Sequence, residues 1–192
     1  MPASAIDGFK KVTLSQGITI EIPAHWNELP IEDRQNLSAM GSAIAANAGI
    51  EMEGLKTNLL AVNAVPAPTQ ATIRVSSTTR PAFTAADLLA MTDADFLDAG
   101  RMVLEQFRQA EKSGGIHVMG MATPRVVTLS GHPTYMLTYF RSGLVDNSEK
   151  WQVTQFQSPL PDRNIQVTVS WNVANEPILK PMLVHVIDSV KF

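Results

Sequence analysis

The sequence has no cysteine among its 192 residues. This absence excludes disulfide bonds, thiolate catalysis, thiolate zinc sites and iron–sulfur clusters. The chain is also poor in charge: charged residues make up 17% of it, the net charge is -3, and the longest basic cluster is Lys10-Lys11. Nucleic-acid-binding proteins normally carry a basic stripe, so no nucleic-acid partner is expected. No apolar run approaches the roughly 20 residues that span a bilayer, so no transmembrane segment is expected in this chain.

Motifs of catalysis and phosphate binding are missing as well. No serine lies in a G-x-S-x-G pattern, and neither G-x-x-x-x-G-K nor G-x-G-x-x-G occurs. The histidines show no HExxH or HxH spacing, and we interpret them as turn and surface residues: His25, His117, His132 and His185. We therefore expect no catalytic residue, no metal site and no cofactor. An enzyme whose site is assembled from dispersed residues is the least favoured alternative.

The N-terminal residues bear on the compartment. Met1 to Ile6 lack the charged region and the apolar region of a signal peptide. We expect a protein of the periplasm or cell envelope if a leader was trimmed, and otherwise a cytoplasmic one.

Hydrophobic residues make up 45% of the chain, enough for one domain with a sizeable core. Thr84 with Asp87 and Thr92 with Asp95 match the capping box that opens a helix, which explains these acidic residues without catalysis. A terminal helix begins near Asn175 or only at Pro181. The remaining patterns predict a hairpin over 11–22, a helix over 31–48, and strands over 56–65, 72–79, 116–121, 125–129, 134–141, 150–157 and 164–171.

The order of these elements indicates the fold class. Strands do not alternate one-for-one with helices, and the later strands follow one another through short connections, which favours an antiparallel meander. Helices early, midway and late in the chain can cover both faces of one sheet. We predict an α+β fold, an α/β/α sandwich with a central, mostly antiparallel β-sheet.

The last strands offer a candidate site. We group their residues into two faces, because successive side chains of a strand point to opposite sides. The first face is almost entirely apolar and is expected to be core: Tyr135, Leu137, Tyr139, Trp151, Val153, Ile165, Val167, Val169 and Trp171. The second face is uncharged and mixed: Met136, Thr138, Phe140, Thr154, Phe156, Gln166, Thr168 and Ser170. In one interpretation, a helix of the chain partly covers this second face. In the other, the second face is an open groove that receives a peptide, a helix or an apolar ligand.

Three segments resemble the PsbP-like superfamily. The segment 17–26, GITIEIPAHW, is similar to its opening strand with Pro-x-x-Trp, and the segment 186–192, VIDSVKF, is similar to its terminal helix with Ser-x-x-Phe. Between them, 127–135, VTLSGHPTY, resembles its strand–Gly-x-Pro–strand element, and the order of elements agrees over nearly the whole chain. The resemblance implies a single PsbP-like domain over residues 1–192, in which 31–55 is a helix-rich insertion.

The superfamily includes photosystem II extrinsic proteins, DcrB-type envelope lipoproteins, Ran-binding Mog proteins and Eag-type effector chaperones. Because its members are mostly adaptors that use different surfaces, the resemblance implies a non-catalytic, bacterial module that binds another protein or peptide. It carries no functional residue over to this chain. The alternative is a carrier of a small apolar ligand with a pocket between sheet and helices: a deep apolar cavity behind Met136 and Phe156 would favour the carrier, and a shallow groove the adaptor.

Overall fold

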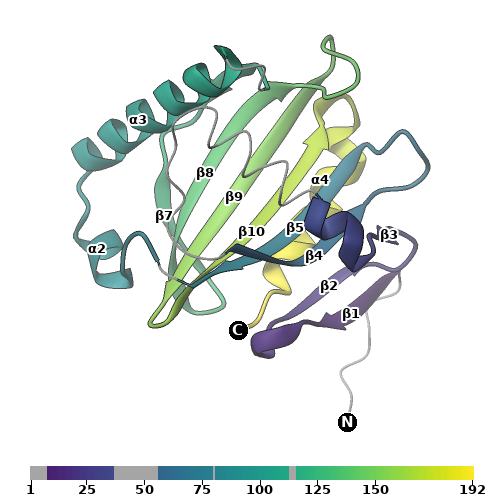
Figure 1. The fold of residues 1–192 in the computed structure, drawn as a ribbon, viewed down its shortest axis with the longest axis horizontal. Helices are drawn as coiled ribbons and strands as arrows, with labels where there is room; N and C mark the ends of the chain where they lie inside the picture. Colours follow the sequence, from purple (N-terminus) through teal and green to yellow (C-terminus); the bar gives the residue numbers. More distant parts are fainter. Residues whose placement is uncertain (1–7, 37–55, 80, 113–115) are drawn as a thin grey trace.

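Figure 1 shows the computed structural model, which describes residues 8–36, 56–79, 81–112 and 116–192. Its centre is an 8-stranded antiparallel sheet in the order β3-β4-β5-β10-β9-β8-β6, and β7 also pairs with β8. The strands are β3 (Asn27–Glu28), β4 (Lys56–Asn63), β5 (Ala71–Thr78), β6 (Val118–Met121), β7 (Arg125–Leu129), β8 (His132–Ser142), β9 (Lys150–Leu160) and β10 (Arg163–Asn172).

A separate two-stranded hairpin and a helix cover one face of this sheet. The hairpin consists of β1 (Phe9–Thr13) and β2 (Thr19–Pro23), joined at Ser15–Gly17, where Gly17 has a φ of +79° that suits glycine. The helix is α4 (Glu176–Asp188), which contacts both β10 and β2. We refer to this side of the sheet as the α4 face.

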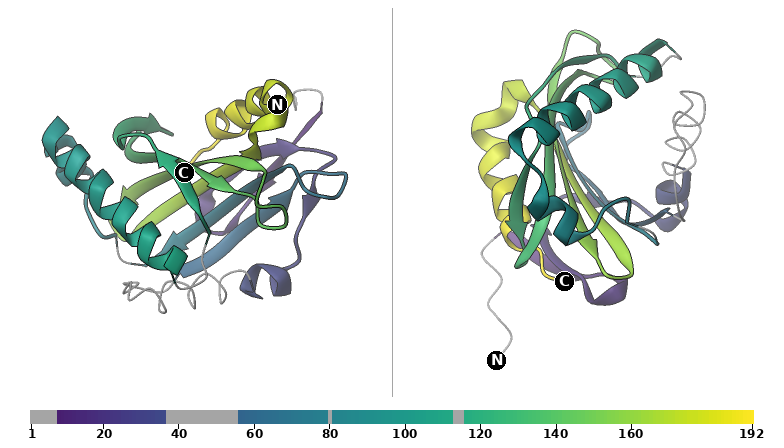
Figure 2. Two further views of the ribbon diagram at one scale, coloured as in Figure 1. Left: turned by 90° about the horizontal axis from the view of Figure 1, so that it is seen from above. Right: turned by 90° about the vertical axis from the view of Figure 1, so that its left-hand side faces the viewer.

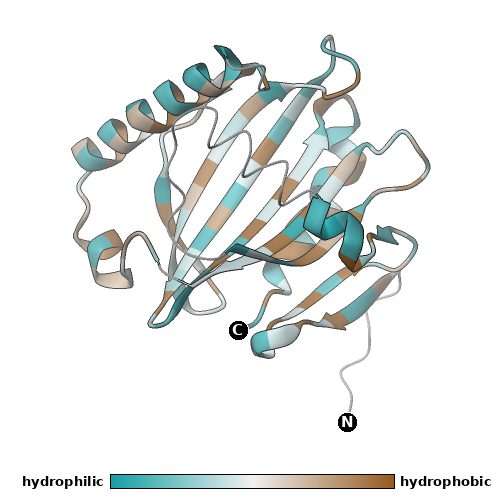
Figure 3. Ribbon diagram, in the orientation of Figure 1, coloured by the Kyte–Doolittle hydropathy of each residue, from teal (hydrophilic) through white to brown (hydrophobic). Residues whose placement is uncertain are grey.

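The α4 face holds the main hydrophobic core. Each strand of the sheet places alternate apolar residues on this face, and Figure 3 shows the alternation as bands along β8, β9 and β10. The core residues beneath the hairpin and α4 include Ile18, Ile20, Ile22, Val62, Ile73, Val75, Val167, Val169, Leu183 and Val186, all 3% exposed or less. This core fixes α4 against the sheet.

Two helices lie along the other face at the β8 edge, and we refer to this side as the α3 face. They are α2 (Ala85–Ala90) and α3 (Asp93–Lys112), which contact β8 and β6 respectively (Figure 2). A smaller buried cluster beneath them contains Leu88, Tyr135 and Leu137, and the Phe107 ring lies 4.7 Å from that of Tyr139. Residues 31–36, which are helical, lie on this side as well, away from α4 (Figure 2).

Both predicted capping boxes are confirmed. The Thr84 hydroxyl accepts from the Asp87 amide at 3.1 Å, and the Asp87 carboxylate accepts from the Thr84 amide at 2.7 Å. Thr92 and Asp95 repeat this arrangement at 3.3 and 2.7 Å. The hydrogen bonds lower the pKa of both carboxyls below the ordinary aspartate value.

The predicted fold class is confirmed: helices lie on both faces of a central antiparallel sheet. The terminal helix begins at Glu176, next to Asn175, which is the first of the two predicted starts; Pro177 lies in its first turn, where a missing N–H costs nothing. Of the helix predicted over 31–48, residues 31–36 are helical and the rest lies outside the described residues.

Candidate functional site

The strand register separates the eight residues of the predicted face. Residues directly opposite each other on neighbouring strands share a face. Met136 pairs with Phe156, and Phe156 pairs with Val167, a core residue of the α4 face. Gln157, in contrast, pairs with Gln166 and with Tyr135, which lies under α2 on the α3 face.

The prediction that all eight residues share one face is therefore wrong. Those on the α4 face are Met136, Thr138, Phe140, Thr154 and Phe156, and those on the α3 face are Gln166, Thr168 and Ser170. The apolar face predicted as one core surface is divided in the same way, between the two cores. The cause is the β9–β10 turn, in which Leu160 pairs with Arg163 across two residues, so that even-numbered residues of β9 meet odd-numbered residues of β10.

The five residues on the α4 face lie beside a groove that runs along α4. The helix contacts β10 and covers the adjoining columns of β9 and β8 only in part: Met136 and Phe156 are partly exposed, and Thr154 is 7% exposed. The resulting groove has a volume of about 360 Å³ and is open to solvent. Its floor is Met136, Thr138, Thr154 and Phe156, and its wall is Leu183, Val184 and Ile187 of α4. Phe140 lies outside the lining residues, with the Lys150 ammonium 4.2 Å from its ring centre.

The groove is apolar at its floor and charged at its ends. The two threonine hydroxyls of the floor, Thr138 and Thr154, hydrogen-bond to each other at 3.1 Å, so this pair can meet an apolar surface without leaving either hydroxyl unpaired. Arg125, Lys180 and Asp188 stand among the lining residues. Lys180 is paired with Glu176 at 2.7 Å.

Sequence reasoning missed the helix wall of this groove. Val184 is 50% exposed, although it stands between the buried residues Leu183 and Val186. The signal was present: Val184 and Ile187 are three residues apart and extend the apolar stripe of the terminal helix beyond what one covered face needs. No sequence pattern indicated that Arg125, the first residue of β7, would line the groove.

The three predicted residues on the α3 face are engaged with their neighbours. The Ser170 hydroxyl lies 2.7 Å from that of Thr72 on β5. The Gln166 amide donates to the Thr168 hydroxyl at 3.1 Å. They form part of a hydrogen-bonded polar surface over the central strands.

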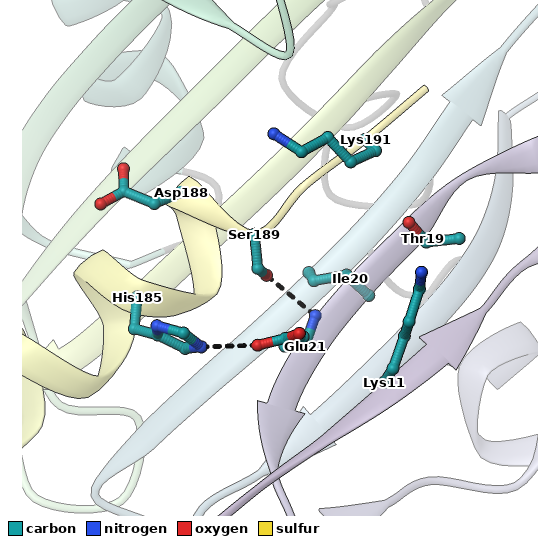
Figure 4. Close-up of a pocket in the computed structure, with 8 residues that line it drawn as sticks. All are labelled: Lys11, Thr19, Ile20, Glu21, His185, Asp188, Ser189 and Lys191. Carbon is teal, nitrogen blue, oxygen red and sulfur yellow. Dashed lines mark hydrogen bonds and ion pairs between the residues drawn. The ribbon is translucent and has the colours of Figure 1, made fainter. Parts of the chain in front are cut away.

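A second cavity, of about 260 Å³, lies where the hairpin meets the end of α4 (Figure 4). His185 Nε2 is 2.8 Å from a carboxylate oxygen of Glu21, and the Glu21 amide donates to the Ser189 hydroxyl at 2.8 Å. That hydroxyl in turn donates to the Val186 carbonyl at 2.7 Å. Because its hydroxyl accepts from one backbone group and donates to another, Ser189 is not arranged as a nucleophile that His185 activates. The cluster fastens α4 to β2 instead, together with two backbone hydrogen bonds between Thr19 and Lys191.

Two further features concern the described part of the chain: metal ligands and membrane spans. There, no group of three or more His, Asp or Glu side chains is arranged to hold a metal ion. None of the described helices combines the length and the apolar character needed to cross a bilayer.

Comparisons with known proteins concern the fold. No family model matches the sequence, and no curated protein matches it significantly. The solution structure of cyanobacterial PsbP (CyanoP) from Synechocystis sp. PCC 6803 is similar, with a TM-score of 0.57 and 10% identity, over 99% of this chain and 95% of that one. So is the crystal structure of LpqN, involved in cell envelope biogenesis of Mycobacterium tuberculosis, with a TM-score of 0.50 and 14% identity, over 95% and 89%. The chain therefore has a PsbP-like fold, as the sequence resemblance implied.

Proposed function

We propose that the chain is a non-catalytic, protein-binding module of the bacterial cell envelope or periplasm, and that one helix of its partner docks in the groove beside α4. The observation that carries this proposal is the partly covered half of the α4 face, where Met136 and Phe156 form an apolar floor next to a helix. The envelope location rests on the fold shared with LpqN, a protein involved in cell envelope biogenesis.

The spacing of the elements favours a helix as the occupant. Neighbouring strands lie about 4.8 Å apart, so β8 is about 10 Å from β10, the strand that α4 contacts. Packed helices lie about 8–10 Å apart. A partner helix at that distance from α4 would lie over β8 and β9 and contact Val184 on its flank. It would complete the helical layer on this side of the sheet.

The length and charges of the groove describe this helix further. The lining residues Gln152, Thr154 and Phe156 follow one another along β9 over about 14 Å, a span that about nine helical residues cover. An apolar stripe would rest on the floor, and an acidic residue of the helix would face Arg125.

The shape of the groove favours the adaptor over the carrier of a small apolar ligand. A carrier encloses most of its ligand in a cavity. Here the floor lies open along α4 and charged side chains stand at its margins. An apolar fluorescent dye tests the alternative: tight, saturable binding that Phe156→Asp abolishes would favour the carrier.

Site-specific photocrosslinking in the producing cells tests the adaptor. A photoreactive phenylalanine at Val184, on the groove wall, should give one adduct with a protein other than this chain. Phe156→Asp should abolish the adduct, because it places a carboxylate on the apolar floor. The matched control is Gln155→Asp, which introduces a carboxylate on the same strand but on the α3 face.

Unfolding midpoints of both variants should stay within the range expected of partly exposed positions. An adduct that survives in a folded Phe156→Asp variant would contradict the proposal. So would an adduct with the mass of two copies of this chain, which would identify the groove as a self-association surface.

A further inference from the structure

A third cavity lies on the α3 face, and two arginines distinguish it. It has a volume of about 430 Å³ between the β4–β5 connection and the β8–β9 connection. We refer to it as the arginine pocket; its lining includes Arg74, Arg141, Trp151, Asn63, Leu144 and Val145. The groove beside α4 opens on the opposite face, so the two sites are independent.

Arg141 is a buried cation with few protein partners. The residue is 8% exposed, and its guanidinium lies 5.0 Å from the centre of the Trp151 ring, directly across the β8–β9 pair. Only one hydrogen bond to an acceptor is formed within the described residues, from Nη1 to the Ser142 carbonyl at 2.8 Å. A guanidinium has five N–H donors, so most of those of Arg141 stay available on the pocket side.

Arg74 is held in place more tightly. Its Nη1 donates to the carbonyls of Val62 and Ile73 at 2.7 and 2.9 Å, and its Nη2 donates to Asn63 Oδ1 at 2.7 Å. Burial lowers the pKa of Arg74 to about 10, which leaves it cationic at neutral pH. Its Nε and one Nη2 hydrogen have no acceptor among the described side chains and backbone.

Neither arginine has a carboxylate within ion-pair distance in the part of the chain that the structure describes. Buried charges in proteins are normally paired, because the loss of hydration is otherwise uncompensated. Glu149 acts on Arg141 only through longer-range attraction, so the free N–H groups of Arg141 indicate that an anion from outside the described residues completes the site.

The margin of the pocket restricts which anion fits. Asp146 and Glu149 are both lining residues, although each is engaged: Asp146 accepts from the Ser148 amide at 2.8 Å, and Glu149 accepts from Trp151 Nε1 at 2.9 Å. Their charges disfavour a doubly charged ligand such as phosphate. Beside them, Leu144 is 70% and Val145 is 97% exposed, which offers an apolar surface at the entrance. The pocket thus combines a cationic floor, a partly acidic margin and an apolar rim.

We propose that the arginine pocket binds the carboxylate of an apolar monocarboxylic acid, either a free small acid or the C-terminal residue of a peptide. The planar fork of Arg141 matches a carboxylate in geometry, and Arg74, whose own fork is held by Val62 and Asn63, adds positive charge elsewhere in the same pocket. Trp151, Leu144 and Val145 provide the surface on which the apolar part of the ligand lies.

Calorimetric titration with matched probes tests this proposal. N-acetyl-leucine represents the small acid, and an N-acetylated tetrapeptide ending in leucine represents the peptide terminus; the amide of each removes the charge. Both acids should bind, both amides should bind at least about tenfold more weakly, and inorganic phosphate should bind more weakly than either acid. Equal affinity of the two acids identifies the small acid as the sufficient ligand, and a tighter peptide identifies a peptide terminus.

Variants then locate the binding. Arg141→Gln should weaken both acids at least about tenfold, and Arg141→Lys, which keeps the charge but loses the fork, should weaken them as well. The control is Arg163→Gln, which removes a partly exposed arginine that lies at the start of β10 and is paired with Asp162. Should Arg141→Gln fail to fold, as its unfolding curve would show, Arg141→Lys carries the test. The proposal is overturned if the acids do not bind, if an amide or phosphate binds as well as the acids, or if the folded Arg141 variants bind with unchanged Kd.

Discussion

The two faces of the central sheet are built from the same strands but have different compositions. On the α4 face, buried aliphatic residues such as Ile73 and Val167 pack under a hairpin and a helix. On the α3 face, the corresponding positions of β5 and β10 carry Arg74 and Thr168, and the buried cluster is confined to the β8 edge under α2. One face therefore supplies most of the burial that stabilises the fold.

This difference places the two candidate sites. A groove beside a helix forms on the apolar face, because α4 packs on β10 and the apolar residues of β9 and β8 extend beyond the helix. A pocket with buried cations forms on the polar face, where strand backbone and amide oxygens hold Arg74. Each site has the chemistry of the face on which it lies.

The largest expected effect compares the two buried clusters. Ile73→Ala, at a residue 0% exposed on the α4 face, should lower the free energy of unfolding by about 4 kcal/mol, because strands and helix around it cannot close the cavity. Leu137→Ala, at 3% exposed on the α3 face, should cost about 2 kcal/mol, since the short helix α2 can move inward. Urea denaturation of both variants measures the difference; equal losses would contradict the unequal roles of the faces.

A second comparison uses one hydroxyl pair on each face. Thr134 and Ser158 are both 0% exposed on the α4 face, and their hydroxyls are 2.7 Å apart. Thr134→Val should cost about 2 kcal/mol, because it leaves the Ser158 hydroxyl buried and unpaired. The matched change on the α3 face, Thr72→Val, should cost about 1 kcal/mol: Ser170 is 4% exposed and loses its partner, but Thr72 lines the open arginine pocket, from which water can reach the site.

The double variant Thr134→Val with Ser158→Ala serves as the internal control. It should be less destabilised than the sum of its two single variants, because no unpaired hydroxyl remains. Additive losses in the same denaturation experiment would show that the pair is not coupled.

A smaller effect concerns how the hairpin is fastened to α4. Ser189→Ala removes the acceptor of the Glu21 amide and should cost about 1 kcal/mol. The specific readout is hydrogen exchange: the Glu21 amide should exchange faster, whereas the exchange of the Leu88 amide within α2 should not change. Unchanged exchange at Glu21 would show that the serine does not link β2 to the helix.

The local features of the fold could be predicted from the sequence. The hairpin at Ser15–Gly17 and the capping boxes at Thr84 and Thr92 depend on residues within a few positions of one another, so short patterns specify them. Which residues of two neighbouring strands share a face depends on the turn that joins the strands. The strand predicted over 150–157 ends too early, because Pro159 lies within β9, and the two-residue turn after Leu160 sets which residues of the two strands pair.

The candidate sites depend on longer-range geometry. How far α4 covers the sheet depends on its packing against β10 and β2, and no segment near residue 184 encodes that. Arg74 and Arg141 line one pocket although β10 and β9 separate their strands in the sheet order. Sequence patterns could identify the apolar residues of β8 and β9 but not what lies over them.

The smallest expected effect is a difference in acid sensitivity between the helices of the two faces. The Thr84 and Thr92 amides and hydroxyls lower the pKa of Asp87 and Asp95 in the folded state. Their stabilising contribution is therefore complete above the unfolded pKa, about pH 4, and is lost as the pH falls through the lower folded value. The cap of α4 does not depend on such a carboxylate, since Asn175 makes no side-chain cap hydrogen bond.

Acid should accordingly loosen α2 and the start of α3 before it loosens α4. Hydrogen exchange at Leu88 and Phe96, corrected for the intrinsic rate, should speed up below about pH 4 relative to Leu183. An Asp87→Asn, Asp95→Asn variant should lose this relative change, because its caps no longer titrate. If Leu183 loosens first in the unmodified chain, acid acts on the α4 face, and the capping boxes are not the acid-sensitive elements of the fold.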